Sequence, residues 1–133
     1  MELHEYQIKS LLARYGIQSP PHLIIEKGQA IETSLASFGI EPLAVKAQVH
    51  GANRKEGGGE RFTRRPKELF EVVKAMLGSQ IVTSDSGPQG FTADKVMVMS
   101  IPSIAKQFQL QLWVDGDGEF VLDLLVGDIQ NRI

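Results

Sequence analysis

The sequence has no cysteine, and this absence excludes several kinds of chemistry. The 133-residue chain can form no disulfide bond, carries no thiol nucleophile and offers no thiolate ligand to zinc. Its histidines, His4, His22 and His50, do not form a spaced metal-binding set either. We therefore predict no metal site within the chain and a reducing environment, with the cytoplasm as the expected location.

The chain also lacks a long apolar run and a strong excess of charge. No apolar run approaches the roughly 18 residues of a membrane span, and the acidic N-terminal segment does not resemble a signal peptide. The 14 basic and 16 acidic residues leave a net charge of −2, which argues against nucleic acid or a membrane as the main partner. With 42% hydrophobic residues, the composition fits one small globular domain or a part of a larger protein.

The first third of the sequence predicts the order helix, strand, helix, strand. Apolar residues recur at helical spacing across residues 3–15, and Gly16 follows where a helix commonly ends. After two prolines, residues 22–26 form a short β-branched run that predicts a strand. A second helix is predicted over residues 29–38, closing at Gly39, before the strand that carries Lys46.

The remaining sequence predicts one further helix and several antiparallel strands. Pro66 suits the first turn of a helix whose apolar face extends to Leu77. Residues 108–114 alternate between apolar and polar side chains and precede an Asp-Gly turn, which is typical of a hairpin. The predicted segments are a strand at 61–63 paired with the Lys46 strand, a helix at 66–77, strands at 80–83 and 95–100, and a hairpin of 108–114 with 120–125.

Lys46 and the glycine-rich loop that follows it are the strongest candidates for a binding site. Lys46 lies in the apolar run 43–49, and residues 51–59 combine glycines with basic side chains. A lysine in an apolar strand needs a charged partner, and a glycine-rich loop can bring backbone amides close to phosphate. The alternative is a lysine on a solvated strand face, which the alternation with Ala44 and Gln48 leaves equally open.

Three motifs resemble the N-terminal part of the β subunit of succinate–CoA ligase, an ATP-grasp enzyme. They are Leu3-His4-Glu5-Tyr6-Gln7, Val45-Lys46-Ala47-Gln48-Val49-His50 and Ile104-Ala105-Lys106, and the resemblance spans essentially the whole chain. It implies an α/β fold of the α+β type, in which residues 21–98 form an ATP-grasp lid subdomain with a mixed or antiparallel sheet and flanking helices. Residues 1–20 and 99–133 are then expected to belong to the larger subdomain, of which this chain holds only the beginning.

The same resemblance implies a nucleotide site. Lys46 matches the lysine that contacts the nucleotide phosphates, and Arg54 matches the arginine of a loop that reads approximately Gly-Gly-Arg-Gly-Lys in the family. Asn53 and Lys55 replace glycines of that loop, and asparagine tolerates a positive φ better than lysine does. The backbone of residues 53–55 is expected to cover the phosphates, and the triple glycine 57–59 is interpreted as a flexible hairpin.

Met99, Pro102 and Gln107 match nucleotide-contact positions near the hinge. The family has an acidic residue at the position of Met99, where a carboxylate can accept hydrogen bonds from the ribose, and a thioether cannot replace it. Gln107 stands where the family has a glutamate, so it keeps an acceptor oxygen and loses the charge. The alternative for Met97 and Met99 is simple packing in the core or the cleft.

By resemblance, the full-length protein couples succinyl-CoA, phosphate and ADP to succinate, CoA and ATP in the citric acid cycle. It would use ATP or GTP with magnesium and an α subunit that carries a phosphohistidine. The metal ligands and the CoA-ligase domain are expected beyond Ile133, so the chain by itself is expected to be inactive, with no catalytic residue of its own.

The alternative is a degenerate or truncated ATP-grasp module that acts by weak nucleotide or protein binding. Exposed apolar residues such as Leu122, Leu124 and Leu125 also predict self-association.

Overall fold

The computed structural model describes residues 2–36, 38 and 42–126. These residues fall into two compact units, one up to Ile101 and the other from Pro102 onward. The predicted assignment of residues 1–20 and 99–133 to a larger subdomain stays a prediction. Among the described helices, none combines the length and the apolar character that a membrane crossing requires.

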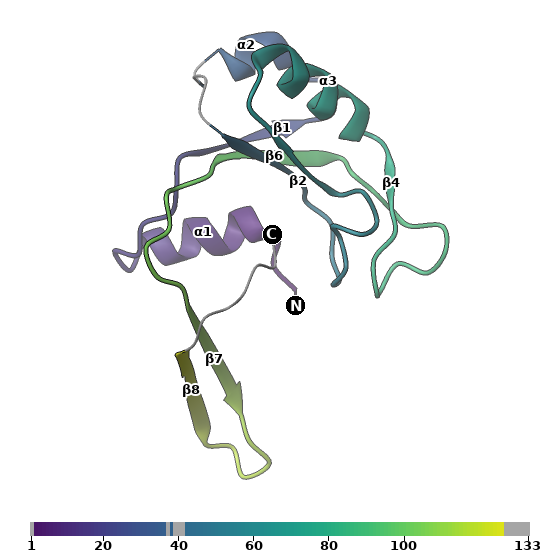
Figure 1. Cartoon of the computed structure of the whole chain (residues 1–133). Helices are drawn as coiled ribbons and strands as arrows, with labels where there is room; N and C mark the ends of the chain where they lie inside the picture. The colour runs from purple at the N-terminus through teal and green to yellow at the C-terminus, as the bar shows by residue number, and fades with distance from the viewer. Residues whose placement is uncertain (1, 37, 39–41, 127–133) are drawn as a thin grey trace. The chain divides into compact units, whose positions relative to one another are not determined.

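The first unit is built on a four-stranded antiparallel sheet (Figure 1). Its strands are β1 (His22–Glu26), β2 (Leu43–Ala47), β3 (Glu60–Thr63) and β6 (Lys95–Ser100), in the spatial order β1-β6-β2-β3. A short ribbon of β4 (Gln80–Ile81) and β5 (Phe91–Thr92) accompanies it. The helices are α1 (Glu5–Ala13), α2 (Ile31–Leu35) and α3 (Pro66–Met76). The predicted mixed α/β fold with an antiparallel sheet is therefore confirmed.

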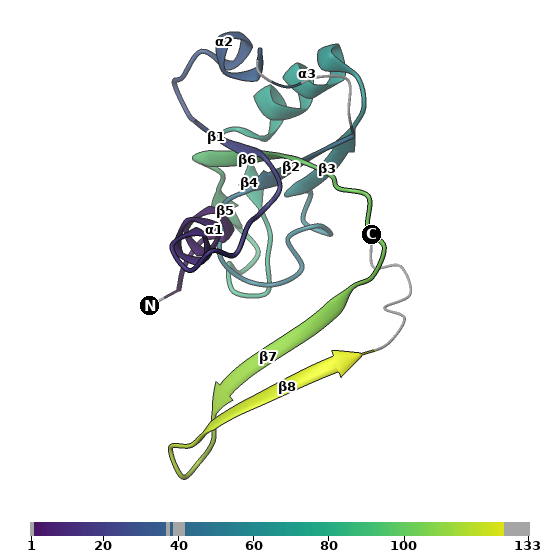
Figure 2. The same cartoon turned by 90° about the vertical axis from the view of Figure 1, so that its left-hand side faces the viewer.

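The two faces of this sheet are covered differently. Helices α2 and α3 lie on one face and α1 lies on the other, as Figures 1 and 2 show. Successive side chains of a strand point to opposite faces, so Val45 points toward α3 while its neighbour Lys46 points toward α1. Lys46 is directly opposite Met97 of β6, which places both side chains on the α1 face.

The face under α2 and α3 holds the hydrophobic core. Helix α3 starts with Pro66 and buries Leu69, Val73 and Met76 against the sheet, in the spacing that the sequence predicts. The strand side of the core includes four fully buried β-branched residues, namely Ile25, Val45, Val96 and Val98. Packing on this face therefore follows directly from the hydrophobic pattern of the sequence.

Two predicted segments differ from the structure. The predicted helix over 29–38 is limited to Ile31–Leu35, because Gln29 closes a turn in which its amide donates to the carbonyl oxygen of Glu26. The side chain of Gln29 also accepts a hydrogen bond from the Glu26 amide. Gly39, the predicted end of that helix, lies outside the described residues. The predicted strand over 80–83 stops at Ile81, because the Thr83 amide donates to the hydroxyl of Ser86 instead of a neighbouring strand.

Helix α1 forms as predicted but buries no residue. Gly16 follows it with a φ of +77°, the conformation expected of a glycine after a helix. At its start, the side chain of Gln7 accepts a hydrogen bond from the backbone amide of His4. None of the residues of α1 is buried, although Ile8, Leu11 and Leu12 each have more than half of their surface covered.

The second unit is the predicted β-hairpin of β7 (Phe108–Val114) and β8 (Phe120–Val126). Its turn is closed by the Asp115 carboxylate, which accepts hydrogen bonds from the amides of Asp117 and Glu119. Apolar side chains from both strands share one face because their positions are in register across the ladder. Seven residues of this apolar face have more than half of their surface exposed. They are Phe108, Leu110, Leu112, Val114, Phe120, Leu122 and Leu124.

We predict that the isolated 133-residue chain self-associates through this face, because a contiguous exposed apolar surface is unfavourable in water. Leu112 is opposite Leu122, so the double change Leu112→Lys and Leu122→Glu inserts a complementary cross-strand pair and should abolish association. The control is Gln111→Lys, which places a lysine opposite Asp123 on the other face and should leave association intact. Sedimentation measures both, and a strictly monomeric wild-type chain at high concentration would contradict the prediction.

Candidate functional site

Lys46 lies on the α1 face of the sheet between two carboxylates. Its ammonium nitrogen is 3.5 Å from Glu5 Oε1, in α1, and 3.5 Å from Glu60 Oε1, on β3. Glu60 is also directly opposite Lys46 in the strand ladder. With only 17% of its side chain exposed, Lys46 does not lie on a solvated strand face. The charge that the sequence places in an apolar strand is therefore neutralised by residues from two other elements.

Arg54, in the glycine-rich loop, reaches the same carboxylate from another direction. Its Nη2 is 2.9 Å from Glu5 Oε2, and its Nη1 donates to the carbonyl oxygen of Ala47 at 3.2 Å. The buried Nε of Arg54 finds no hydrogen-bond partner among the described residues. The guanidinium thus holds the loop to the end of β2 and keeps one donor unused.

Glu5 joins these cations at a single point. Its two oxygens contact Lys46 and Arg54, and Lys9, one helical turn further on, lies 3.7 Å from Oε1. Burial acts to raise the pKa of Glu5, but Lys46, Arg54 and Lys9 together lower it below its usual value. The carboxylate is therefore held in its ionised form at neutral pH. A carboxylate bound by a lysine and an arginine is the arrangement expected of an anion-binding position.

The loop from Gly51 to Gly59 is closely packed. Its end is fixed because the Gly59 amide donates to the Arg54 carbonyl oxygen and the Gly59 carbonyl oxygen accepts from Ala47, each at 2.8 Å. A Cβ atom on Gly57 would lie 2.0 Å from the carbonyl oxygen of Val82, so this position has no room for a side chain. The triple glycine was interpreted only as a flexible hairpin. The structure shows that Gly57 and Gly59 are also needed for steric reasons, because they pack closely against β4 and Val82, the residue that follows it.

The substituted loop positions behave differently from each other. Asn53 has a φ of +60° and is the one non-glycine residue with a positive φ in the part of the chain that the structure describes, a conformation that asparagine tolerates better than most residues. Lys55 has no such backbone requirement, and its ammonium lies 5.9 Å from the centre of the Phe62 ring. The lysine is therefore compatible with the loop conformation.

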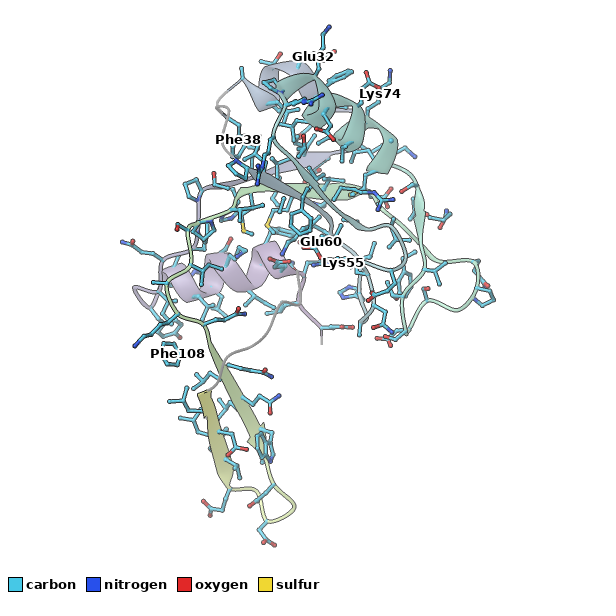
Figure 3. All side chains as sticks on the ribbon, in the orientation of Figure 1. Glu32, Phe38, Lys55, Glu60, Lys74 and Phe108 are labelled. Carbon is cyan, nitrogen blue, oxygen red and sulfur yellow. The ribbon has the colours of Figure 1, made fainter. Side chains whose placement is uncertain are left out.

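A cavity of about 470 Å³ opens beside Arg54. Figure 3 shows Lys55 and Glu60, two of its lining residues, next to helix α1. The charged side chains that line it are those of Glu2, Glu5, Glu56 and Glu60 on the acidic side and those of Arg54 and Lys55 on the basic side. Acidic groups are in excess, so an anion that enters this cavity meets repulsion as well as attraction.

Of the three predicted hinge residues, Met99 belongs to the first unit and is not among the residues that line this cavity. Met99 is partly buried in β6 opposite Ala44, on the same face as Lys46 and Met97. Met97 is fully buried, which confirms packing as the role of that methionine. Pro102 and Gln107 are exposed residues of the second unit. A nucleotide-binding role for Met99, Pro102 and Gln107 stays a prediction.

The structure also reveals site residues that the sequence analysis did not single out, namely Glu5, Glu60 and a pair of stacked histidines. The rings of His4 and His50 lie 4.0 Å apart with an angle of 20° between their planes. Glu2 approaches His50 at 3.5 Å. The need of Lys46 for a counter-charge was the one signal that could have led to the two glutamates. In the described part of the chain, no group of three or more histidine, aspartate or glutamate side chains is arranged to hold a metal ion.

The structure is an antiparallel sheet covered by helices. A lysine on an inner strand and an arginine from the following glycine-rich loop both contact one carboxylate, which is the arrangement of an anion-binding α/β module. Residues 2–124 match the family of the ATP-grasp domain, and the chain belongs to this family.

The relatives of the chain support a more specific resemblance. It is 36% identical over 115 residues to the succinate–CoA ligase [ADP-forming] subunit beta of Desulfotalea psychrophila, covering 86% of this chain and 30% of the relative. The protein of the same name from Methylobacillus flagellatus is 34% identical over 122 residues, with 92% and 32% covered. That of Baumannia cicadellinicola is 34% identical over 135 residues, with 98% and 34% covered. The resemblance seen in the sequence is confirmed, and the chain spans about a third of the length of these relatives.

The histidine stack leads to a prediction about pH. Burial first and the neighbouring His50 second lower the pKa of His4 below 6.5; Lys95 and Arg54 act in the same direction, and Glu2 opposes them. As the pH falls, His4 is therefore protonated in the unfolded chain at a higher pH than in the folded chain. The unfolded state then binds more protons, so the free energy of unfolding should fall as the pH drops from about 7 through 6.5. His4→Phe keeps a ring for stacking and should reduce this slope.

Urea denaturation at several pH values between 5.5 and 8.5 measures the effect. The two proteins should have parallel stabilities above pH 7.5 and diverge below it, which serves as the internal control. A titration of His4 by nuclear magnetic resonance with its midpoint at or above 6.5 would show that the prediction is wrong.

Proposed function

We propose that this chain is the nucleotide-binding N-terminal portion of an ATP-dependent succinate–CoA ligase β subunit. In this proposal the complete protein works with an α subunit and magnesium in the cytoplasm. It converts succinyl-CoA, phosphate and ADP to succinate, CoA and ATP, a step of the citric acid cycle, or uses the guanine nucleotide in place of the adenine one. The ATP-grasp family and the names of the relatives support this assignment.

The convergence of Lys46 and Arg54 on one carboxylate is the observation that carries the proposed nucleotide site. A lysine from β2 and an arginine from the loop both lie within 3.5 Å of the Glu5 oxygens. Phosphate oxygens carry the same kind of charge as a carboxylate and accept the same hydrogen bonds. In this proposal, Lys46 and Arg54 bind the nucleotide phosphates and offset the charge that develops during phosphoryl transfer.

The adjoining loop would complete the phosphate contacts. Asn53, Arg54 and Lys55 line the cavity, and the unused Nε of Arg54 is a further donor for an anion. Magnesium bound to the phosphates would lower the repulsion from the acidic residues of the cavity wall. Met99, Pro102 and Gln107 would approach the nucleoside, with Met99 unable to accept a hydrogen bond from ribose.

We predict weak ATP binding, with a dissociation constant between high micromolar and millimolar, or about −4 to −6 kcal/mol. Lys46→Ala should weaken binding further because it removes a phosphate contact, and Met99→Glu should leave it unchanged or improve it because it restores an acceptor for ribose. Affinity should fall as salt increases, since charge attraction supplies much of the binding. Calorimetry with ATP and magnesium measures these effects.

Lys74→Ala is the matched control for this experiment. Lys74 belongs to α3, on the other side of the sheet from α1 (Figure 3). Its replacement by alanine removes the same charge as Lys46→Ala does. Its affinity for ATP should equal that of the wild type. Submicromolar binding that is insensitive to Lys46→Ala would place the nucleotide elsewhere.

The second candidate function is a non-catalytic module that acts through weak nucleotide or protein binding. The excess of acidic groups around the cavity and the absence of a carboxylate at position 99 favour it. Under this alternative, ATP binding would be absent or unaffected by Lys46→Ala, so the same calorimetric series separates the two candidates.

We further expect the 133-residue chain alone to form no succinyl-CoA from succinate, CoA and ATP with magnesium. The chain spans about a third of the length of the relatives that carry the ligase name. In this proposal, the metal ligands and the CoA-ligase domain belong to parts of the complete protein outside this chain. An assay with and without an α subunit tests this expectation. Robust product formation by the unassisted chain would refute it.

A further inference from the structure

Glu5 occupies the position at which the proposed function requires phosphate. Its carboxylate takes up the Nη2 of Arg54 at 2.9 Å and the ammonium of Lys46 at 3.5 Å. A phosphate oxygen bound by the same two groups would lie within a few ångströms of the Glu5 oxygens, where two negative charges repel each other. Glu5 and a nucleotide phosphate therefore cannot both use these cations fully.

The helix that carries Glu5 is attached in a way that permits its release. No residue of α1 is buried, and the exposed fractions of Ile8 and Leu11 are both 42%. Apart from the ion pairs of Glu5, one hydrogen bond and two ring contacts join α1 and the residue before it to the sheet and the loop. They are the bond from the Tyr6 amide to Gln48 Oε1 at 3.2 Å, the approach of the Lys95 ammonium to the Tyr6 ring at 5.8 Å and, just before the helix, the stack of His4 on His50.

This kind of attachment differs from that of α3 on the opposite face. Helix α3 buries Leu69, Val73 and Met76, so its removal would expose a large apolar area. Release of α1 would uncover part of the surface of Ile8 and Leu11 and would open the face on which Met97 is buried, but it would expose no fully buried residue of the helix itself. The ion pairs of Glu5 are therefore a larger share of the attachment of α1 than of that of α3, and a ligand that replaces them compensates for part of the cost.

We propose that Glu5 is an internal anion that competes with the nucleotide phosphates for Lys46 and Arg54, so that nucleotide binding displaces Glu5 and loosens α1. This inference rests on the proposed nucleotide site. It adds Glu5 as a residue that sets the affinity of the site and couples the site to the N-terminal helix.

A different role for Glu5 predicts the opposite effect. If Glu5 acted only to hold Lys46 and Arg54 in position for phosphate, removing its charge would disorder both cations and weaken binding. If it competes, removing its charge leaves two cations without their partner and strengthens binding. A single isosteric change, Glu5→Gln, therefore separates competition from positioning.

The first test is calorimetry of ATP with magnesium on the whole chain. Glu5→Gln should tighten binding by roughly three- to tenfold, the range that a partly screened ion pair supplies. The control is Glu32→Gln, which removes the same charge from α2, far from α1 (Figure 3), and should leave the affinity unchanged. Weaker or unchanged binding by Glu5→Gln overturns the inference.

The second test follows hydrogen exchange of the backbone amides. Saturating ATP should accelerate exchange in α1 of the wild type, and Glu5→Gln should show faster exchange there without ATP. Unchanged protection of β2 and β6 in the variant shows that the sheet remains folded. Slower exchange in α1 on ATP binding overturns the inference.

The series also separates this inference from the proposed function. If Lys46→Ala weakens binding and Glu5→Gln does not tighten it, the nucleotide site stands and the competition is refuted. If neither Lys46→Ala nor Glu5→Gln changes ATP binding, the proposed site itself is wrong, and the inference fails with it.

Discussion

The structure depends on the need to neutralise a lysine in the middle of an apolar strand. Lys46 alternates with the fully buried Val45, so the packing of one face of the sheet fixes the lysine on the other. A mostly buried ammonium is stable only with nearby counter-charges, and Glu60 from β3 and Glu5 from α1 provide them. Arg54 joins the same network through Glu5. One charge in one strand thereby links the hairpin partner, the N-terminal helix and the glycine-rich loop.

The two faces of the sheet consequently differ in composition and in what they contribute. On the α2 and α3 face, apolar side chains supply the stability through burial, and the described residues of its core include no charged side chain. On the α1 face, charged and polar groups meet in a small space and remain partly exposed. An arrangement of this kind contributes little to stability for its size, but it can exchange one anion for another. The rigid apolar face supports the face on which binding is proposed.

Much of the fold could be predicted from local signals in the sequence. The strand at 22–26, the helix from Pro66 and the hairpin around residues 115–118 follow from alternation, helical periodicity and turn residues, which act over short distances along the chain. The two-residue strand β5 was missed because so short a segment has no detectable period. The positive φ of Asn53 could be predicted from sterics, but the partners of Lys46 could not. Glu5 is 41 residues away in the sequence, and many glutamates would have satisfied the same need. Lys46 stood out by its place in an apolar strand, its role and Arg54 were predicted by resemblance, and the structure adds the carboxylate that joins them.

The close approach of Gly57 to the Val82 carbonyl oxygen shows that positions of this loop differ in their tolerance of sequence change. Lys55 and Glu56 project exposed side chains, and their replacement leaves the packing of the loop intact, whereas the φ of +60° restricts the residues that can replace Asn53. Gly57 and the buried Gly59 have neighbours at less than 3 Å from any added carbon, so these two positions are closed to variation. During evolution, the chemistry at the cavity mouth could therefore drift while the path of the backbone stayed the same. A library that aims to retune ligand preference would randomise Lys55 and Glu56 and keep the glycines, Asn53 and Arg54 fixed.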